Sequence, residues 1–264
     1  MESALEEIEF LALSSNRVTV LSELSDGSRT RSALAEATGA SQATLGRILE
    51  DFQDRSWIRR DGGSYIATPT GELVSNGFTN LLTILDTERD LRDVVPYLPV
   101  DSITFDLSHL TDATVIQPTE TRPGAPLQRA LELAATADEM VTFSHAFNNQ
   151  SLAAVEERVT EGSLSFYGVF SQSAIDALTA DSELCHLLAA LVDASNAEIH
   201  VRDEDIPLAV LVADDVVHLL LRDDRGVLQG SIETRDETIL AWANDRFEQY
   251  WEASRPLDRA ELAK

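Results

Sequence analysis

The sequence predicts a chain of mixed α+β and α/β structure in three parts: a small N-terminal domain of helices and a hairpin (1–70), a linking helix (71–99) and a C-terminal α/β domain with a mixed sheet (100–264). Three observations predict this organisation. The 264 residues are enough for two ordinary domains. Up to residue 70, short helical patterns separated by glycine precede a strand–turn–strand. From about residue 100, strand-like apolar runs alternate with helical stretches.

The composition is strongly acidic. The chain carries 46 acidic and 20 basic side chains, a formal charge of −26, and its only lysine is the last residue, Lys264. Without an internal lysine there can be no P-loop, no pyridoxal Schiff base, no kinase-type ATP lysine and no His-x-Lys motif of phospholipase D chemistry. Acid-rich, lysine-poor chains suit proteins that stay dissolved in molar salt, where the Debye length is about 3 Å. We therefore expect a halophilic source.

The chain also has the composition of a cytoplasmic protein. Its one cysteine, Cys185, cannot form an internal disulfide, which agrees with a reducing compartment. The N-terminus is acidic where a signal peptide would be basic. The longest apolar stretch, 208–221, is interrupted by Asp214, Asp215 and His218, so we expect no membrane span.

Within the N-terminal domain, two short helices follow one another. Residues 30–38 form a helical pattern stopped by Gly39, and Ser41 can cap a second helix over 42–55. Leu45, Ile48, Leu49 and Phe52 recur at helical spacing, which indicates one buried face. The opposite face carries short polar groups and an arginine, the types that contact base edges and phosphates: Ser41, Gln42, Thr44 and Arg47.

A hairpin follows these helices. Residues 58–60 and 65–67 have strand character and flank the glycine-rich turn 61–64. Helix, glycine turn, helix and small hairpin together predict a winged helix-turn-helix. The window 28–60 holds six arginines against four acids, so it is net positive within a very acidic chain. Such a local reversal of charge suits a surface that contacts phosphate, although chance clustering of arginines is the alternative.

The string Ala33-Leu34-Ala35-Glu36-Ala37-Thr38-Gly39-Ala40-Ser41-Gln42-Ala43-Thr44, continued by Arg47-Ile48-Leu49, resembles the DNA-binding domains of IclR- and TrmB-like prokaryotic regulators. The resemblance implies binding of double-stranded DNA. We then expect Ser41, Gln42, Thr44 and Arg47 in the major groove, Arg29, Thr30 and Arg31 at phosphates, and Arg59, Arg60, Gly62, Gly63 and Ser64 in the wing. The alternative is a winged helix that contacts only protein.

The linking helix carries an apolar stripe near heptad spacing: Val74, Phe78, Leu81 or Leu82, and Leu85. Because a helix between two domains has little of its own chain to pack against, we expect this stripe to form the seam of a homodimer. A dimer would also supply the two recognition helices that a two-fold DNA site requires. The alternative is that the stripe packs onto Leu5, Ile8, Leu11 and Leu13 of the same chain.

The C-terminal domain shows strand-like runs at 141–143, 164–170, 198–201, 208–212, 216–222 and 227–233, with helical stretches at 152–160, 175–194 and 236–254. The ending Gly230-Ser231-Ile232-Glu233-Thr234, then Trp242-Ala243 and Phe247-Glu248-Gln249-Tyr250-Trp251, resembles the effector domain of archaeal winged-helix regulators of the methanogenesis-regulator family and, more distantly, of TrmB-like regulators. The resemblance implies a degenerate phospholipase D-like fold without its catalysis.

Polar side chains after two predicted strands form a candidate effector site. Ser144, His145, Asn148 and Asn149 follow one strand, and Arg202 follows another. Ligands of open α/β sheets bind at the carboxyl ends of strands, so a small polar or anionic effector is expected there. The alternatives are a turn capped by asparagines and an ion pair of Arg202 with a nearby acid.

The remaining motifs point away from catalysis. The five histidines have no metal-ligand spacing, and one cysteine cannot build a zinc knuckle, so we expect no metal and no cofactor. No nucleophile elbow and no dinucleotide-binding fingerprint is present. We therefore expect a dimeric transcription regulator with a C-terminal domain that senses a small molecule or stabilises the dimer. A protein-interaction scaffold is the alternative, and an enzyme with a DNA-binding appendage is a third.

Overall fold

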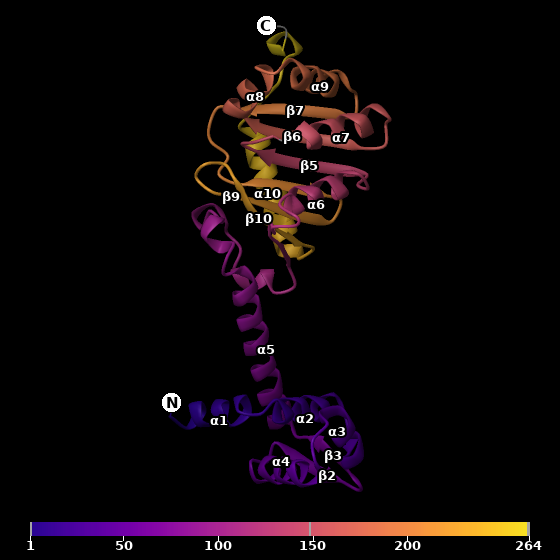
Figure 1. Cartoon of the computed structure of the whole chain (residues 1–264), viewed down its shortest axis with the longest axis vertical. Coiled ribbons are helices and arrows are strands. Elements are labelled where there is room, and N and C mark those ends of the chain that lie inside the picture. The colour runs from indigo at the N-terminus through magenta and orange to yellow at the C-terminus, as the bar shows by residue number, and fades with distance from the viewer. Residues whose placement is uncertain (1, 148, 263–264) are drawn as a thin grey trace. The chain divides into compact units, whose positions relative to one another are not determined.

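The structure, a computed structural model, describes residues 2–147 and 149–262 (Figure 1). The chain divides into two units, Met1–Asp86 and Thr87–Lys264. The division lies inside helix α5 (Pro69–Leu91) and not at residue 70, where the sequence suggested the first boundary. The helix expected to link two domains is therefore part of both units. None of the described helices is both long and apolar enough to cross a membrane.

The N-terminal unit is a winged helix, as predicted. Its elements are α1 (Glu2–Ala12), α2 (Ser15–Asp26), β1 (Arg29–Thr30), α3 (Arg31–Thr38), α4 (Gln42–Asp54), β2 (Ile58–Asp61), β3 (Ser64–Ala67) and the first turns of α5. β2 and β3 form the predicted antiparallel hairpin. The short strand β1, which the sequence pattern did not reveal, adds to the other edge of β3.

Local chemistry fixes the turn between α3 and α4. Thr30 caps α3 by accepting a hydrogen bond from the Ala33 N–H at 3.2 Å. Gly39 ends α3 with a left-handed φ of +65° and donates its N–H to the Ala35 carbonyl at 2.9 Å. On α4, the predicted apolar face is buried through Leu45, Ile48, Leu49 and Phe52. The opposite face of α4 is thereby directed away from the core.

The C-terminal unit is built on an eight-stranded mixed sheet in the order β11-β7-β6-β5-β8-β9-β10-β4. The strands β5, β6 and β7 run parallel, and the other neighbours are antiparallel. The bounds are β4 (Thr114–Ile116), β5 (Glu139–Ser144), β6 (Ser165–Ser171), β7 (Ala197–Arg202), β8 (Ala209–Ala213), β9 (Val216–Arg222), β10 (Leu228–Thr234) and β11 (Arg255–Pro256). The predicted mixed sheet is confirmed, and the two short edge strands β4 and β11 were not predicted.

Helices cover both faces of this sheet (Figure 1). One face is covered by α6 (Ala125–Ala134), α7 (Asn149–Thr160), α8 (Gln172–Thr179) and α9 (Ser182–Asp193), and the other by α10 (Glu237–Glu252). Short 3-10 helices lie at Val95–Tyr97, Val100–Ser102, Leu107–Leu110 and Arg259–Leu262. The helical stretch predicted over 175–194 is divided because Asp181 leaves the helical conformation and caps α9 through the N–H groups of Glu183 and Leu184. Helix α6 was not predicted.

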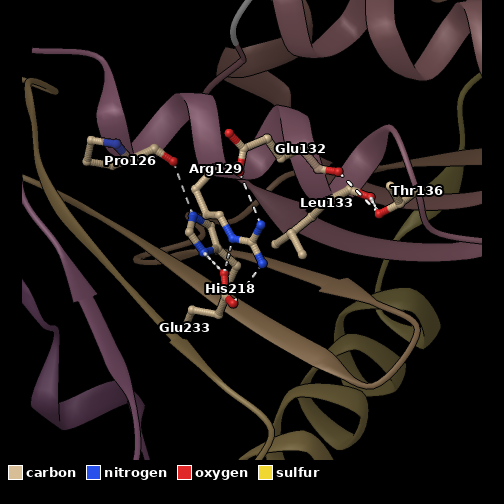
Figure 2. Close-up of polar contacts among 7 residues, drawn as sticks. All are labelled: Pro126, Arg129, Glu132, Leu133, Thr136, His218 and Glu233. Carbon is tan, nitrogen blue, oxygen red and sulfur yellow. Dashed lines mark hydrogen bonds and ion pairs between the residues drawn. The ribbon is translucent and has the colours of Figure 1, made fainter. Parts of the chain in front are cut away.

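A polar cluster fastens α6 to the sheet (Figure 2). The Arg129 guanidinium of α6 donates to both carboxylate oxygens of Glu233 on β10, at 2.6 and 2.9 Å. His218 of β9 is fully buried, with its Nε2 3.3 Å from the Pro126 carbonyl and its Nδ1 3.8 Å from the Glu233 carboxylate. Burial lowers the pKa of His218 to about 4, and the hydrogen bond from Arg129 lowers the pKa of Glu233.

These shifts predict a loss of stability in mild acid. The unfolded chain protonates its histidine near pH 6.5, whereas folded His218 stays neutral until about pH 4. The free energy of unfolding should therefore fall as the pH drops from about 6.5 to 4, with His218 contributing a loss of about 3 kcal/mol. Urea titrations across this range should show a flatter profile for His218→Gln.

The matched control is His186→Gln, at an exposed histidine of α9, which should keep the wild-type profile. Parallel profiles of the wild type and His218→Gln would contradict a neutral His218.

Candidate functional site

The outward face of α4 carries three of its four predicted contact residues fully in the open. Ser41, Gln42 and Arg47 are exposed, whereas Thr44 is half-buried. Ser41 also has a structural role, since its hydroxyl accepts the Thr44 N–H at 3.2 Å as the N-cap of the helix. The Ser41 and Thr44 hydroxyls lie 3.0 Å apart. The face therefore offers a long amide, an arginine and a pair of coupled hydroxyls.

The start of α3 lies beside the start of α4. Arg31 is exposed and donates to the Gln42 carbonyl, and the missing side chain of Gly46 leaves room for it, since a Cβ there would lie 2.7 Å from an Arg31 nitrogen. Thr30 is occupied as the cap of α3. Arg29 forms an ion pair with Glu23 at 2.9 Å. Of the three residues predicted to contact phosphate, only Arg31 thus combines exposure with a charge that no carboxylate neutralises in the described chain.

The hairpin provides the second exposed basic element. Arg59 and Arg60 are exposed on β2, and Arg60 lies over the ring of Tyr65, its cross-strand neighbour, at 5.9 Å. The strands are joined by Gly62 and Gly63, and Gly62 has a φ of +61°. Positive φ at the first central residue is typical of a type II′ turn and favours glycine. The tip, including Gly63, is exposed, and Ser64 is half-buried.

The arginines of this unit fall into two groups. Arg17, Arg29 and Arg55 pair with Asp51, Glu23 and Glu7, and Arg17 and Arg55 also lie over the ring of Phe10, so these three stabilise the fold. By contrast, no ion pair is formed within the described residues by four exposed arginines on α3, α4 and β2, namely Arg31, Arg47, Arg59 and Arg60. In a chain of charge −26, this leaves a cationic surface suited to an anionic polymer.

The predicted effector residues lie at the carboxyl ends of the parallel strands, but few of them are available. Ser144 is buried, and its hydroxyl donates to the Ala146 carbonyl at 2.7 Å. His145 is half-buried, and its pKa is lowered by burial and by the positive charge of Arg222. Asn149 is exposed at the start of α7, and Asn148 lies outside the described residues. Arg202 forms the alternative ion pair with a nearby acid, Glu204, and lies 4.7 Å over the ring of Tyr250.

A cavity of about 90 Å³ opens next to Ser144, between the sheet and helices α6 and α7. Its walls are mostly apolar, and the charged side chain that lines it is Arg222, at the end of β9. Arg222 was not among the residues expected at this site. Its position at the end of an apolar strand is visible in the sequence, and antiparallel pairing through β8 brings that end to Ser144. Without the pairing of β8 with β5, however, nothing in the sequence connects 144 with 222.

The stripe on α5 divides between two environments. Phe78, 8% exposed, packs in the core of the N-terminal unit with Leu11, and Val74 packs against the same core, so these two face their own chain and not a partner. Leu81, Leu82 and Leu85 are exposed, as are several apolar side chains on or next to α1 and α5: Leu5, Ile8, Leu13, Leu73 and Ile84. An open groove of about 620 Å³ runs between these helices.

Among residues 2–147 and 149–262, no three His, Cys, Asp or Glu side chains are grouped closely enough to hold a metal ion.

Two family models match the chain, one in its N-terminal part and one in its C-terminal part. Residues 5–90 match the family model described as the HVO_A0261 N-terminal domain. Residues 123–253 match the model described as the middle domain of the methanogenesis regulatory protein FilR1. The resemblance of the C-terminal domain to domains of the methanogenesis-regulator family is thus confirmed. No curated protein matches the chain significantly.

Three solved structures are similar to the chain at low identity. The structure of TrmBL2, an archaeal chromatin protein with a novel mode of DNA binding, is 14% identical and covers 95% of this chain and 98% of its own, with a TM-score of 0.44. The phospholipase D family member Nuc from Salmonella typhimurium is 11% identical over 55% of this chain and 97% of its own, with a TM-score of 0.43. NucT from Helicobacter pylori is 12% identical over 55% and 98%, with a TM-score of 0.41.

The cap at Ser41 predicts a measurable stability effect. Ser41→Ala removes the acceptor for the Thr44 N–H and should destabilise α4 by about 1 kcal/mol, whereas Ser41→Asp supplies a new acceptor and should keep the helix intact. Amide hydrogen exchange of the α4 peptide measures the difference. Ser32→Ala, at an exposed serine inside α3, is the control and should not accelerate exchange in α4. Equal protection in Ser41→Ala and the wild type would show that the cap is dispensable.

Proposed function

We propose that this chain, which joins an HVO_A0261-type N-terminal domain to a FilR1-type middle domain, is a sequence-specific DNA-binding transcription regulator of the cytoplasm. The observation that carries the proposal is the outward face of α4, where Gln42 and Arg47 are exposed beside arginines that have no carboxylate partner in the described chain. Long side chains on an exposed helix behind a tight turn are suited to the edges of bases in a major groove.

In this proposal each element of the winged helix has a separate task. Ser41, Gln42, Thr44 and Arg47 of α4 contact the bases. The hairpin, with Arg59, Arg60, Gly62, Gly63 and Ser64, lies along the phosphate backbone, where the absence of side chains at the glycines permits close approach. Arg31 contacts a phosphate at the start of α3, and Thr30 and Arg29 hold that start in position through the cap and the ion pair with Glu23.

The acidic charge of the chain limits how such binding can work. A net charge of −26 repels DNA at long range, and only a few arginines oppose it. At about 1 M salt the Debye length is about 3 Å, so both the repulsion and the attraction are screened. Affinity then depends on direct hydrogen bonds, packing and the use of two recognition helices. The proposal therefore includes a homodimer.

We further propose that the exposed apolar surface of α1 and α5 forms the dimer seam. Large apolar side chains in the open, as at Leu73, Leu81, Leu82, Ile84 and Leu85, are gathered along one helix and beside an apolar groove. Exposed apolar side chains grouped on one helix are typical of interaction sites in soluble proteins. The C-terminal unit is proposed to sense a small molecule. For control of DNA binding, that molecule must bind two conformations of the dimer with different affinities.

Two substitutions separate base contacts from backbone contacts. On a sequence selected by the full chain from random duplexes, Arg47→Ala should weaken binding about tenfold or more and reduce the preference over other sequences. Arg60→Ala should weaken binding to all sequences alike and reduce the log–log salt slope by about 0.9. Electrophoretic mobility shifts at several salt concentrations measure both effects.

The control is Arg259→Ala, which removes an exposed arginine of the C-terminal unit that pairs with Asp193. It should leave affinity and slope unchanged. If no duplex sequence is enriched, or if Arg47→Ala retains both affinity and preference, α4 is not a recognition helix, and a protein-binding role of the winged helix becomes the better account.

The dimer seam is tested at Leu85, whose side chain is 54% exposed. Leu85→Glu places a charge within the proposed apolar contact and should raise the dimer dissociation constant at least about tenfold. Sedimentation velocity measures the change. Val227→Glu, at an exposed apolar side chain of the C-terminal unit, should dimerise like the wild type. A monomeric wild type, or an unaffected Leu85→Glu, would remove α5 from the interface.

A further inference from the structure

The cavity between the sheet and helices α6 and α7 combines apolar walls with one cationic side chain. We propose that it binds a small monocarboxylic acid, with an apolar tail of a few carbons among the walls and its carboxylate on Arg222. This inference rests on the proposed sensing role of the C-terminal unit and names the class of molecule that is sensed.

The first observation in favour of a bound carboxylate is that the hydrogen bonds of Arg222 are incomplete. The Arg222 Nη1 donates to the Gly226 carbonyl at 2.9 Å, but the Nε is buried without a hydrogen-bond partner in the described structure. No carboxylate pairs with the guanidinium there, and burial lowers its pKa. A buried donor without an acceptor costs free energy. A carboxylate bound at the guanidinium would compensate the charge and supply the acceptors that this side chain lacks.

Other arginines of the same unit show what a satisfied guanidinium looks like. Arg129, on the helix that forms one wall of the cavity, binds Glu233 through two nitrogens. Arg158 has no carboxylate but donates to the carbonyls of Ala134, Ala137 and Ser163. Arg222 has neither arrangement, although the chain carries 46 acidic residues. The structure therefore leaves a place for an external anion at this arginine.

Asp223, the acidic residue next to Arg222 in the sequence, uses its carboxylate for other hydrogen bonds. The Asp223 carboxylate accepts the N–H groups of Arg225 and Val227, at 3.0 and 2.9 Å, and the side-chain amide of Gln229 at 2.9 Å. These bonds hold the turn between β9 and β10. Asp223 is thus a structural residue of the turn and does not neutralise Arg222.

The walls and the size of the cavity define the rest of the ligand. Met140, Leu152, Val155, Phe166 and Phe170 are buried or nearly so and offer no hydrogen bonds. The volume of about 90 Å³ is smaller than the cavity of about 150 Å³ that holds benzene in an engineered protein, so a tail of a few carbons fits. A neutral hydrocarbon would leave Arg222 unpaired, and a second carboxylate would be buried among apolar side chains without a cation. One carboxylate satisfies both constraints.

The first turn of α7 adds to the preference for an anion. Ser151, in this first turn, lines the cavity, and α7 runs for 12 residues from Asn149. The positive end of a helix dipole favours negative charge near such a terminus. The helix end and Arg222 therefore both favour an anion in this cavity.

The test uses the full chain without DNA and three probes in isothermal titration calorimetry. 3-Methylbutanoate carries both the tail and the charge, 3-methylbutan-1-ol carries the tail alone, and acetate carries the charge with almost no tail. The wild type should bind 3-methylbutanoate about tenfold or more tightly than either of the others, because the hydrogen bonds to a charged group are lost in the alcohol and the apolar contacts are lost in acetate.

Three variants test whether Arg222 and the cavity cause the preference for 3-methylbutanoate. Arg222→Gln should bind the acid and the alcohol equally weakly. Arg225→Gln removes the same charge from an exposed arginine of the adjoining turn and should keep the wild-type preference. Ala130→Leu fills the cavity from α6 and should weaken binding of the acid at least about tenfold. Circular dichroism spectra that match the wild type show that the variants fold.

The outcomes separate this inference from the proposed function. Equal affinity of the wild type for acid and alcohol, or no binding of 3-methylbutanoate at about 10 mM, would overturn the assignment of a carboxylate to Arg222 even if the chain binds DNA. Binding of the acid with the expected variant pattern would support it even if DNA affinity, measured in parallel, does not respond. In that case only the proposed sensing role would be lost.

Discussion

The scarcity of positive charge is the constraint on which both candidate sites depend. A chain with 46 acidic and 20 basic residues can offer a carboxylate to almost any arginine, and ion pairs such as Arg129–Glu233, Arg255–Glu261 and Arg259–Asp193 show that it often does. An arginine without a carboxylate partner is therefore a candidate anion site, unless backbone carbonyls occupy its donors as they do at Arg158. Those of the N-terminal unit are gathered on α3, α4 and the hairpin, in the open. Arg222 lies half-buried at the edge of an apolar cavity. The first arrangement suits a long polymer of phosphates, and the second suits a single small anion.

The parts of the fold that local chemistry determines could be predicted from the sequence. The turn between α3 and α4 was predictable because Gly39 and Ser41 each perform a specific local task, and the buried face of α4 followed from its spacing. Helix α6 was missed since its start, Ala125-Pro126-Leu127, follows a loop and its helical character depends on packing against the sheet and on Arg129 binding Glu233, 104 residues away. The strands β1, β4 and β11 are two or three residues long, and their extended conformation comes from partners that no local pattern reveals.

The candidate sites differ in the same way: one depends on local sequence and the other on strands that are far apart in the sequence. On α4, a helix has a fixed periodicity, so the exposed residues could be selected from the sequence once the buried ones were known. The cavity is different, because it is assembled by the sheet. Ser144 was selected correctly as a strand end, but its hydroxyl is used by Ala146, and the residue that brings charge to the cavity, Arg222, reaches it through antiparallel pairing of β8 and β9. Of the residues expected at a dimer seam on α5, Phe78 packs into the core of its own unit, with Leu11 and the α4 residues.

Within the C-terminal unit, strand β10 contacts both α6, which forms one wall of the cavity, and Val94, which lies just after α5. Glu233 of β10 holds α6, one wall of the cavity, through Arg129. On the same strand, Gly230 permits the close approach of Val94, which lies just beyond α5, since a Cβ at this glycine would be 2.9 Å from a Val94 methyl group. Leu91, the last residue of α5, and Val94 are both buried in the core that contains Ile232. If the cavity binds the proposed acid, a ligand that shifts α6 would act on Glu233, and a displaced β10 would strain its packing against Val94, because close-packed interiors transmit strain instead of absorbing it. The residues that line the proposed ligand cavity are connected in this way, through β10, to the end of the helix that both units share.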